Sequence, residues 1–144
     1  MSYSLDVNLL LYASDRSSAR HDAARRFLES CAAGPEVLCV AWPTLMSYLR
    51  IATHPSIFAA ALSPTEAFEN VTALLSMPHV RAVSELDGFA DAYKHVTSKV
   101  VVRGNLVPDA HLAAILFQHG IRTLYSSDRD FHKFVSLDVR DPFS

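Results

Sequence analysis

Short apolar segments alternate with helical segments along this chain, and this alternation is the feature that most restricts its fold. The segments that predict strands are YSLDV (3–7), VLCV (37–40), VRAV (80–83), RTLYSS (122–127) and LDVRD (137–141). A continuous apolar run such as 37–40 is typical of a strand that is buried on both faces, and such strands occur in parallel sheets. The sequence therefore predicts an α/β fold with helices on both faces of a parallel sheet.

Five segments have the apolar periodicity of helices and carry Ser, Pro or Gly where helices begin or end. They are residues 18–32, 43–54, 63–77, 85–100 and 107–120. The chain has 144 residues and contains no internal repeat, so we expect a single domain over 1–144.

Composition narrows the class of protein further. Half of the residues are hydrophobic and 19% are charged, which is typical of a folded domain. Cys31 and Cys39 have no CxxC spacing, and no apolar run approaches the length of about 20 residues that a membrane helix needs. We therefore expect a cytoplasmic protein with no membrane span. The formal net charge of −2 gives no general attraction to nucleic acid, so such binding requires a local site.

Three aspartates fall where a parallel sheet of this kind binds its ligands, at the carboxyl ends of the strands. Asp6 and Asp128 follow predicted strands, and Asp109 begins a predicted helix. Alone, Asp109 is explained as a helix-start residue and Asp128 as a turn residue. Together the carboxylates would repel one another unless a divalent cation such as Mg²⁺ or Mn²⁺ were bound. This pattern indicates metal-assisted hydrolysis of a phosphodiester.

The segments LDVNLLLYA, VPDAHLAAIL and LYSSDRDF resemble, in order and spacing, the signature of PIN-domain ribonucleases, and the match is nearest to VapC-type toxins of bacterial toxin–antitoxin systems. The resemblance implies a three-layer α/β/α domain with a short central parallel sheet of four to five strands. It also implies Mg²⁺-dependent cleavage of RNA, a small VapB-type antitoxin as partner, and a homodimer.

The resemblance assigns the catalytic and metal-binding roles to Asp6, Asp109 and Asp128, with Asp130 as the second acid of the last motif. It also places Asn8 and Ser127 at polar positions that commonly support the site.

One position departs from the family pattern. Ser47 stands where the family usually has a Glu, and Asp130 is the first candidate to make up the missing charge. Arg50 and His54 share a helix face, and Arg129 lies between the two acids of the last motif, so we expect all three to contact substrate phosphate. The alternative for these cations is a solvated surface.

Two other functions fit parts of the pattern. The absent Glu motivates a catalytically weak or inactive module that binds RNA or protein on the same fold. A phosphatase with an aspartyl nucleophile after the first strand is the third hypothesis, but that chemistry uses a second acid where Asn8 stands.

Overall fold

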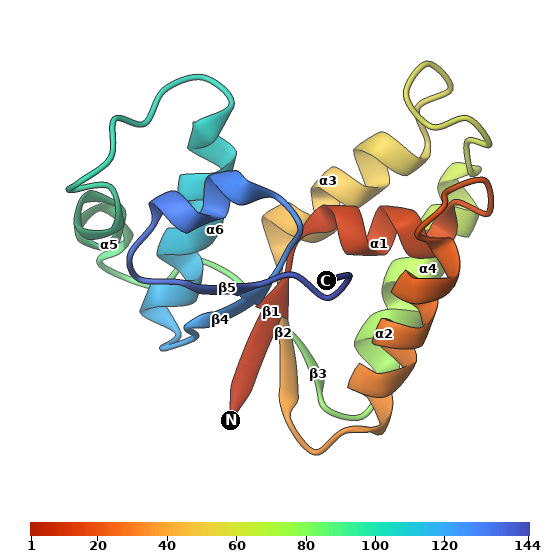
Figure 1. The fold of residues 1–144 in the computed structure, drawn as a ribbon, viewed down its shortest axis with the longest axis horizontal. Helices are drawn as coiled ribbons and strands as arrows, with labels where there is room; N and C mark the ends of the chain where they lie inside the picture. The colour runs from red at the N-terminus through yellow and green to blue at the C-terminus, as the bar shows by residue number, and fades with distance from the viewer.

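The computed structural model describes residues 1–144, and its centre is a sheet of five parallel strands in the order β3-β2-β1-β4-β5 (Figure 1). The strands are β1 (Ser2–Leu5), β2 (Val37–Ala41), β3 (Val80–Val83), β4 (Thr123–Tyr125) and β5 (Asp138–Arg140). The helices are α1 (Val7–Ser14), α2 (His21–Ala33), α3 (Trp42–Ala52), α4 (Pro64–Ser76), α5 (Phe89–Val96) and α6 (Leu106–Gln118), with a 3₁₀ helix η1 (Arg129–Lys133). The predicted parallel α/β architecture is confirmed.

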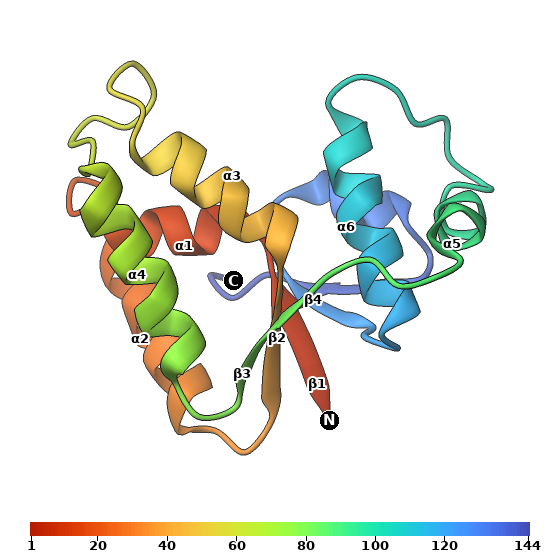
Figure 2. The same cartoon turned by 180° about the vertical axis from the view of Figure 1, so that it is seen from behind.

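The helices form two layers, one on each face of the sheet (Figure 1 and Figure 2). Leu38 and Val40 of β2 point into a core that they share with α1, α3 and α4. Cys39 and Ala41 of the same strand point into the opposite core, which contains the buried face of α6. This alternation along one strand is the reason that a continuous apolar run is needed at the centre of the sheet.

The first helix, α1, differs from the sequence prediction. Residues 3–7 were expected to form one strand, but β1 ends at Leu5 and Val7 already begins α1. The Asp6 carboxylate accepts a hydrogen bond from the Asn8 backbone N–H at 2.9 Å and so starts the helix. Its apolar run is continuous because α1 packs against both α2 and α3, and this continuity hides the helical period.

The strand register fixes where the functional side chains emerge. Leu5 of β1 pairs with Tyr125 of β4, so the residues that follow these strands leave the sheet side by side. The Asp6 N–H donates to the Tyr125 carbonyl at 3.2 Å, which extends this pairing by one residue. No helix of this protein has both the length and the apolar character that crossing a membrane requires.

Candidate functional site

Three carboxylates meet at the carboxyl edge of the sheet. Asp109 lies in the first turn of α6, Asp128 is the N-cap of η1, and Asp130 lies in the first turn of η1. One oxygen from each of these side chains lies within 4.8 Å of the others. Two segments that are distant in the sequence therefore bring three acids to one point.

Asp6 lies close enough to Asp109 and Asp128 to act on their charge, but its oxygens are not among the three that converge. Its side chain is only 4% exposed, and one oxygen is occupied by the Asn8 N–H. The other oxygen accepts a hydrogen bond from the Ser126 hydroxyl. Burial raises the pKa of Asp6, and its two hydrogen bonds partly offset this effect. Asp6 therefore supports the edge of the sheet from within, while Asp109, Asp128 and Asp130 are more accessible.

The clustering of negative charge contributes to a raised pKa of Asp109. Burial raises its pKa to about 6, with further contributions from the carboxylates of Asp128, Asp130 and Asp6. Lys133 is the one cation that acts in the opposite direction. Its amine lies 3.2 Å from an Asp130 oxygen, with both side chains about half exposed. The protein thus supplies less positive charge than the acids require, which is typical of a site that takes a cation.

The serine that braces the site is Ser126, which sequence reasoning missed. Its hydroxyl donates to Asp6 and accepts the Asp128 backbone N–H at 2.9 Å, so it joins the ends of β1 and β4. The sequence prediction gave a supporting role to Ser127, whose hydroxyl instead accepts a hydrogen bond from Arg20 at 3.1 Å. Alternation along β4 was the available signal, because Leu124 and Ser126 fall on the same buried side.

The other predicted site residues are spread over three elements. Asn8 contributes its backbone N–H to Asp6, and Ser47 lies half-buried on α3. Arg50 is exposed on α3, and the His54 ring accepts a hydrogen bond from the Ser56 N–H at the end of that helix. Arg129 is exposed at the start of η1. None of these side chains belongs to the carboxylate group.

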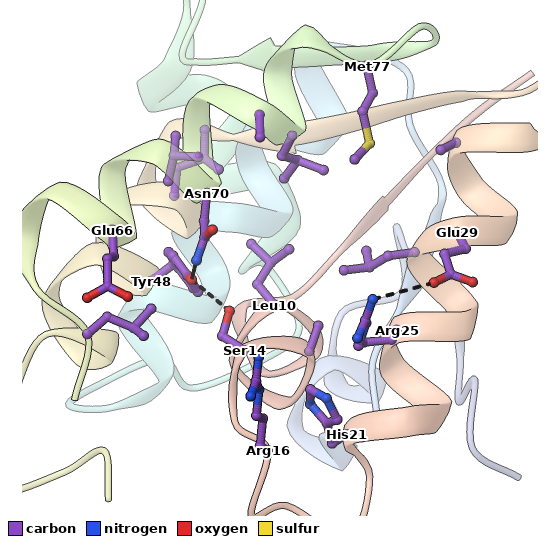
Figure 3. Close-up of a pocket in the computed structure, with 18 of the residues that line it drawn as sticks. Leu10, Ser14, Arg16, His21, Arg25, Glu29, Tyr48, Glu66, Asn70 and Met77 are labelled. Atoms are coloured by element: carbon purple, nitrogen blue, oxygen red, sulfur yellow. Dashed lines mark hydrogen bonds and ion pairs between the residues drawn. The ribbon is translucent and has the colours of Figure 1, made fainter. Parts of the chain in front are cut away.

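A second feature is a mainly apolar pocket of about 780 Å³, lined in part by α1, the helix that Asp6 caps. Twelve of its 20 lining residues are hydrophobic, and they come mainly from α1, α2 and α4. Figure 3 shows a polar chain on its wall, in which the Tyr48 hydroxyl accepts from Asn70 at 2.9 Å and lies 2.7 Å from the Ser14 hydroxyl. The hydroxyl of the buried Tyr48 is therefore satisfied within the protein, and charged side chains such as Arg25, Glu29 and Glu66 stand among the hydrophobic residues of the lining.

Comparisons with known proteins agree with this architecture. Residues 3–136 match the model of the PIN domain family. The chain is 47% identical over 144 residues to Ribonuclease VapC48 of Mycobacterium tuberculosis, covering 100% of this chain and 99% of that protein. It is 32% identical to Ribonuclease VapC37 of the same species, covering 96% and 95% of the two chains.

Solved structures show the same fold at lower sequence identity. VapBC2 from Rickettsia felis, bound to a DNA fragment from its promoter, superposes with a TM-score of 0.71 at 15% identity, covering 98% of each chain. The sarcin-ricin loop cleaving toxin VapC20 of Mycobacterium tuberculosis gives a TM-score of 0.67 at 20% identity, covering 94% of this chain and 98% of that one. Since the family model spans nearly the whole sequence and full-length relatives exceed 30% identity, this chain belongs to the PIN-domain family.

Proposed function

We propose that this chain, acting as a single domain over residues 1–144, is a metal-dependent endoribonuclease and the toxin of a toxin–antitoxin pair. The observation that carries the proposal is the carboxylate group formed by Asp109, Asp128 and Asp130 at the edge of a PIN fold. The 47% identity to a full-length ribonuclease supports RNA as the substrate.

The donor set fits a divalent cation. Three carboxylate oxygens within 4.8 Å of one another, together with the raised pKa of Asp109, match the all-oxygen sites that Mg²⁺ and Mn²⁺ prefer. When bound, such a cation neutralises charge on a phosphodiester and makes water a better nucleophile. Asp109, Asp128 and Asp130 would hold it. Asp6, which the resemblance assigns to the same set, remains a proposed ligand, and its hydrogen bond from Ser126 keeps the ends of β1 and β4 in place.

Asp130 supplies the third negative charge that Ser47 does not. No acidic residue occurs on α3, so the family's usual Glu has no counterpart there. Asp130 lies in the carboxylate group, although Lys133 competes for one of its oxygens. The Lys133 amine would therefore compete with a bound cation for that oxygen. Arg50, His54 and Arg129 remain the proposed phosphate contacts, all on or next to exposed ends of α3 and η1.

The proposed partner is a VapB-type antitoxin. Several structural relatives are toxin–antitoxin complexes, such as the Rickettsia VapBC2 assembly. The acidic group attracts a bidentate cation, so we expect the antitoxin to insert an arginine there. The apolar pocket beside α1 supplies the surface for an apolar segment of the same partner. We also propose a homodimer, for which the exposed Leu86 and Phe117 near the end of α6 offer an apolar contact. A protein that cuts cellular RNA is expected in the cytoplasm.

The experiment that tests the proposal compares Asp109→Asn with wild type. The change removes one negative charge from the carboxylate group. Cleavage of total RNA in the presence of Mn²⁺ should therefore fall at least about 100-fold, which is the size expected for the loss of an electrostatic catalytic group. End-mapping of the RNA measures this effect. Glu69→Gln, an exposed acid on α4, is the matched control and should cleave like wild type. Full activity of Asp109→Asn would exclude the proposed site.

The absence of an acid on α3 favours one second candidate, a PIN-fold module that binds RNA without cutting it. Wild-type protein that leaves RNA intact at millimolar Mn²⁺, and that binds no metal in a titration, would decide in favour of this candidate.

A further inference from the structure

We propose that Arg20 forms a phosphate-binding subsite next to the carboxylate group and holds the RNA backbone there. This inference rests on the ribonuclease function proposed above and adds to it a substrate contact on α2. The resemblance assigned no role to Arg20.

The Arg20 guanidinium lies against two aromatic rings. Its central carbon lies 5.6 Å from the centroid of the Tyr12 ring and 4.9 Å from that of the Phe143 ring. The two rings also contact each other edge to face, with centroids 5.9 Å apart. The rings come from α1 and the C-terminal segment, so two separate parts of the chain orient one cation. Such stacking favours a guanidinium over an ammonium, because the planar group can lie against a ring.

The backbone at Arg20 is anchored as well. The Arg20 N–H donates to the Ser18 hydroxyl at 3.1 Å, and the Arg20 carbonyl accepts from the Ala24 N–H at 2.9 Å. The side chain therefore starts from a fixed point at the beginning of α2. An arginine that is ordered before binding loses little conformational entropy when it takes up a ligand.

The cation has capacity for a further ligand. A guanidinium carries five N–H groups, and the structure records one hydrogen bond from that of Arg20, to the Ser127 hydroxyl at 3.1 Å. None of the ion pairs in the structure includes Arg20, and the residue is exposed. A positive charge that is held in place without a carboxylate partner is suited to a phosphate, which accepts two parallel N–H bonds from it.

The position of Arg20 links it to the carboxylate group. Ser127, which accepts its hydrogen bond, lies between Ser126 and Asp128, the residues that brace and form that group. The acids repel RNA, and the whole chain has a net charge of −2, so local cations must hold the strand. Arg20 donates its hydrogen bond to Ser127, the residue directly before Asp128. Neither Arg50 nor His54 forms a hydrogen bond with that segment. Arg20 is therefore placed to hold a phosphate next to the one that is cut.

Binding of a fluorescent single-stranded oligoribonucleotide tests the proposal. The measurement uses full-length protein in an Asp109→Asn background, which prevents cleavage. Arg20→Gln keeps a donor for Ser127 but loses the charge, and it should weaken binding about tenfold, the size expected for one charge-assisted contact. The slope of log affinity against log salt should fall by about 0.7, the value for one phosphate of a single strand. Arg20→Lys should restore the slope and part of the affinity, because it keeps the charge without the planar fork.

Two controls separate a phosphate contact from a structural role. Arg26→Gln removes an exposed arginine from the same helix and should change neither affinity nor slope. Ser127→Ala removes the hydrogen bond and keeps the Arg20 charge, so the salt slope should remain that of the parent protein. The proposal is overturned if Arg20→Gln binds like Arg26→Gln, or if Ser127→Ala reproduces the whole loss of affinity and slope.

Failure of this inference is distinct from failure of the ribonuclease function. Wild-type protein that does not cut RNA with Mn²⁺ would refute the enzyme, while the binding measurement would still report on Arg20. If wild type cuts RNA and Arg20→Gln instead loses only affinity for a protein partner, the subsite proposed here is excluded and the enzyme stands.

Discussion

At the scale of single residues, Asp109 shows that the site is arranged for a ligand at the expense of stability. Its carboxylate is half-buried beside Asp128 and Asp130, and its pKa is raised to about 6. A charge that the fold disfavours at neutral pH is a common property of functional sites. The free protein therefore keeps an unfavourable interaction that a bound cation relieves.

Removing this charge should stabilise the metal-free protein in a pH-dependent way. The pKa of Asp109 is higher in the folded state than its usual value of 3.8 in an unfolded chain, so the folded state binds more protons between these values. Wild type should lose stability as the pH rises from about 4 to about 6, and Asp109→Asn should not show this loss. At about pH 8 we expect the variant to be more stable by roughly 1 kcal/mol, a value reduced to allow for solvent screening.

Urea unfolding with EDTA at about pH 4 and about pH 8 checks this prediction. Glu69→Gln on α4 controls for the loss of one exposed acid. The difference between Asp109→Asn and wild type should be larger at the higher pH, and parallel pH profiles for the two proteins would contradict the prediction. Adding Mn²⁺ should then stabilise wild type and Glu69→Gln more than Asp109→Asn.

At the scale of elements, the sequence predicted the sheet better than the details of the site. Residues 37–40 and 80–83 were predicted as strands from their apolar runs, since burial on both faces leaves a clear signal in the sequence. The helix α1 was missed because burial on several sides gives a helix the same continuous apolar run as a strand. The strand order was not predicted, because it depends on pairing between distant segments.

The site itself followed from the topology only in part. The rule that ligands bind at the carboxyl ends of parallel strands placed Asp6, Asp109 and Asp128 on one edge of the sheet. The resemblance then assigned catalytic and metal-binding roles to them. Which oxygens converge depends on the turn after β4, where η1 brings Asp130 next to Asp128 and a hydrogen bond joins Ser126 to Asp6. That turn also brings Ser127 to Arg20 on α2, a contact over 107 residues of chain that no local pattern contains.

The helix α1 offers a test of how Asp6 acts. Asp6→Asn and Asp6→Ala both remove the buried charge, but only Asn keeps an oxygen that can accept the Asn8 N–H and cap the helix. We expect Asp6→Ala to be less stable than Asp6→Asn by about 1 kcal/mol in urea unfolding. Equal stability of the two variants would mean that the cap contributes nothing. Both should lose RNA cleavage relative to wild type, because the carboxylate behind the site is gone in each.

At the scale of the whole molecule, α1 connects the two features that a partner would use. Its N-terminus is capped by Asp6 behind the carboxylate group, and Leu10, Ala13 and Ser14 from the same helix line the apolar pocket. Eight helical residues span about 12 Å. A partner segment in the pocket is therefore within reach of the acids, so a single chain that covers both would block the site.

A substitution on the pocket wall should separate partner binding from RNA cleavage. Ala73 is an exposed residue of α4 that lines the pocket, and Ala73→Arg puts a long charged side chain into an apolar surface. We expect it to weaken binding of the proposed VapB-type antitoxin by at least about tenfold, because a charge buried in the contact without a partner is unfavourable. Cleavage of RNA by the free protein should be unchanged, since the carboxylate group is built from α6 and η1.

Thr72→Arg is the matched control for this last change. Thr72 is the exposed neighbour of Ala73 on α4, it does not line the pocket, and its substitution adds the same charge to the same helix. Co-purification of the two proteins from cells that express both measures binding, and inhibition of RNA cleavage by the antitoxin measures its effect. If Ala73→Arg loses co-purification and inhibition while Thr72→Arg keeps them, the pocket is the binding site of the partner. If Ala73→Arg remains bound and inhibited, the partner docks elsewhere, and inhibition acts through the carboxylate group without this pocket.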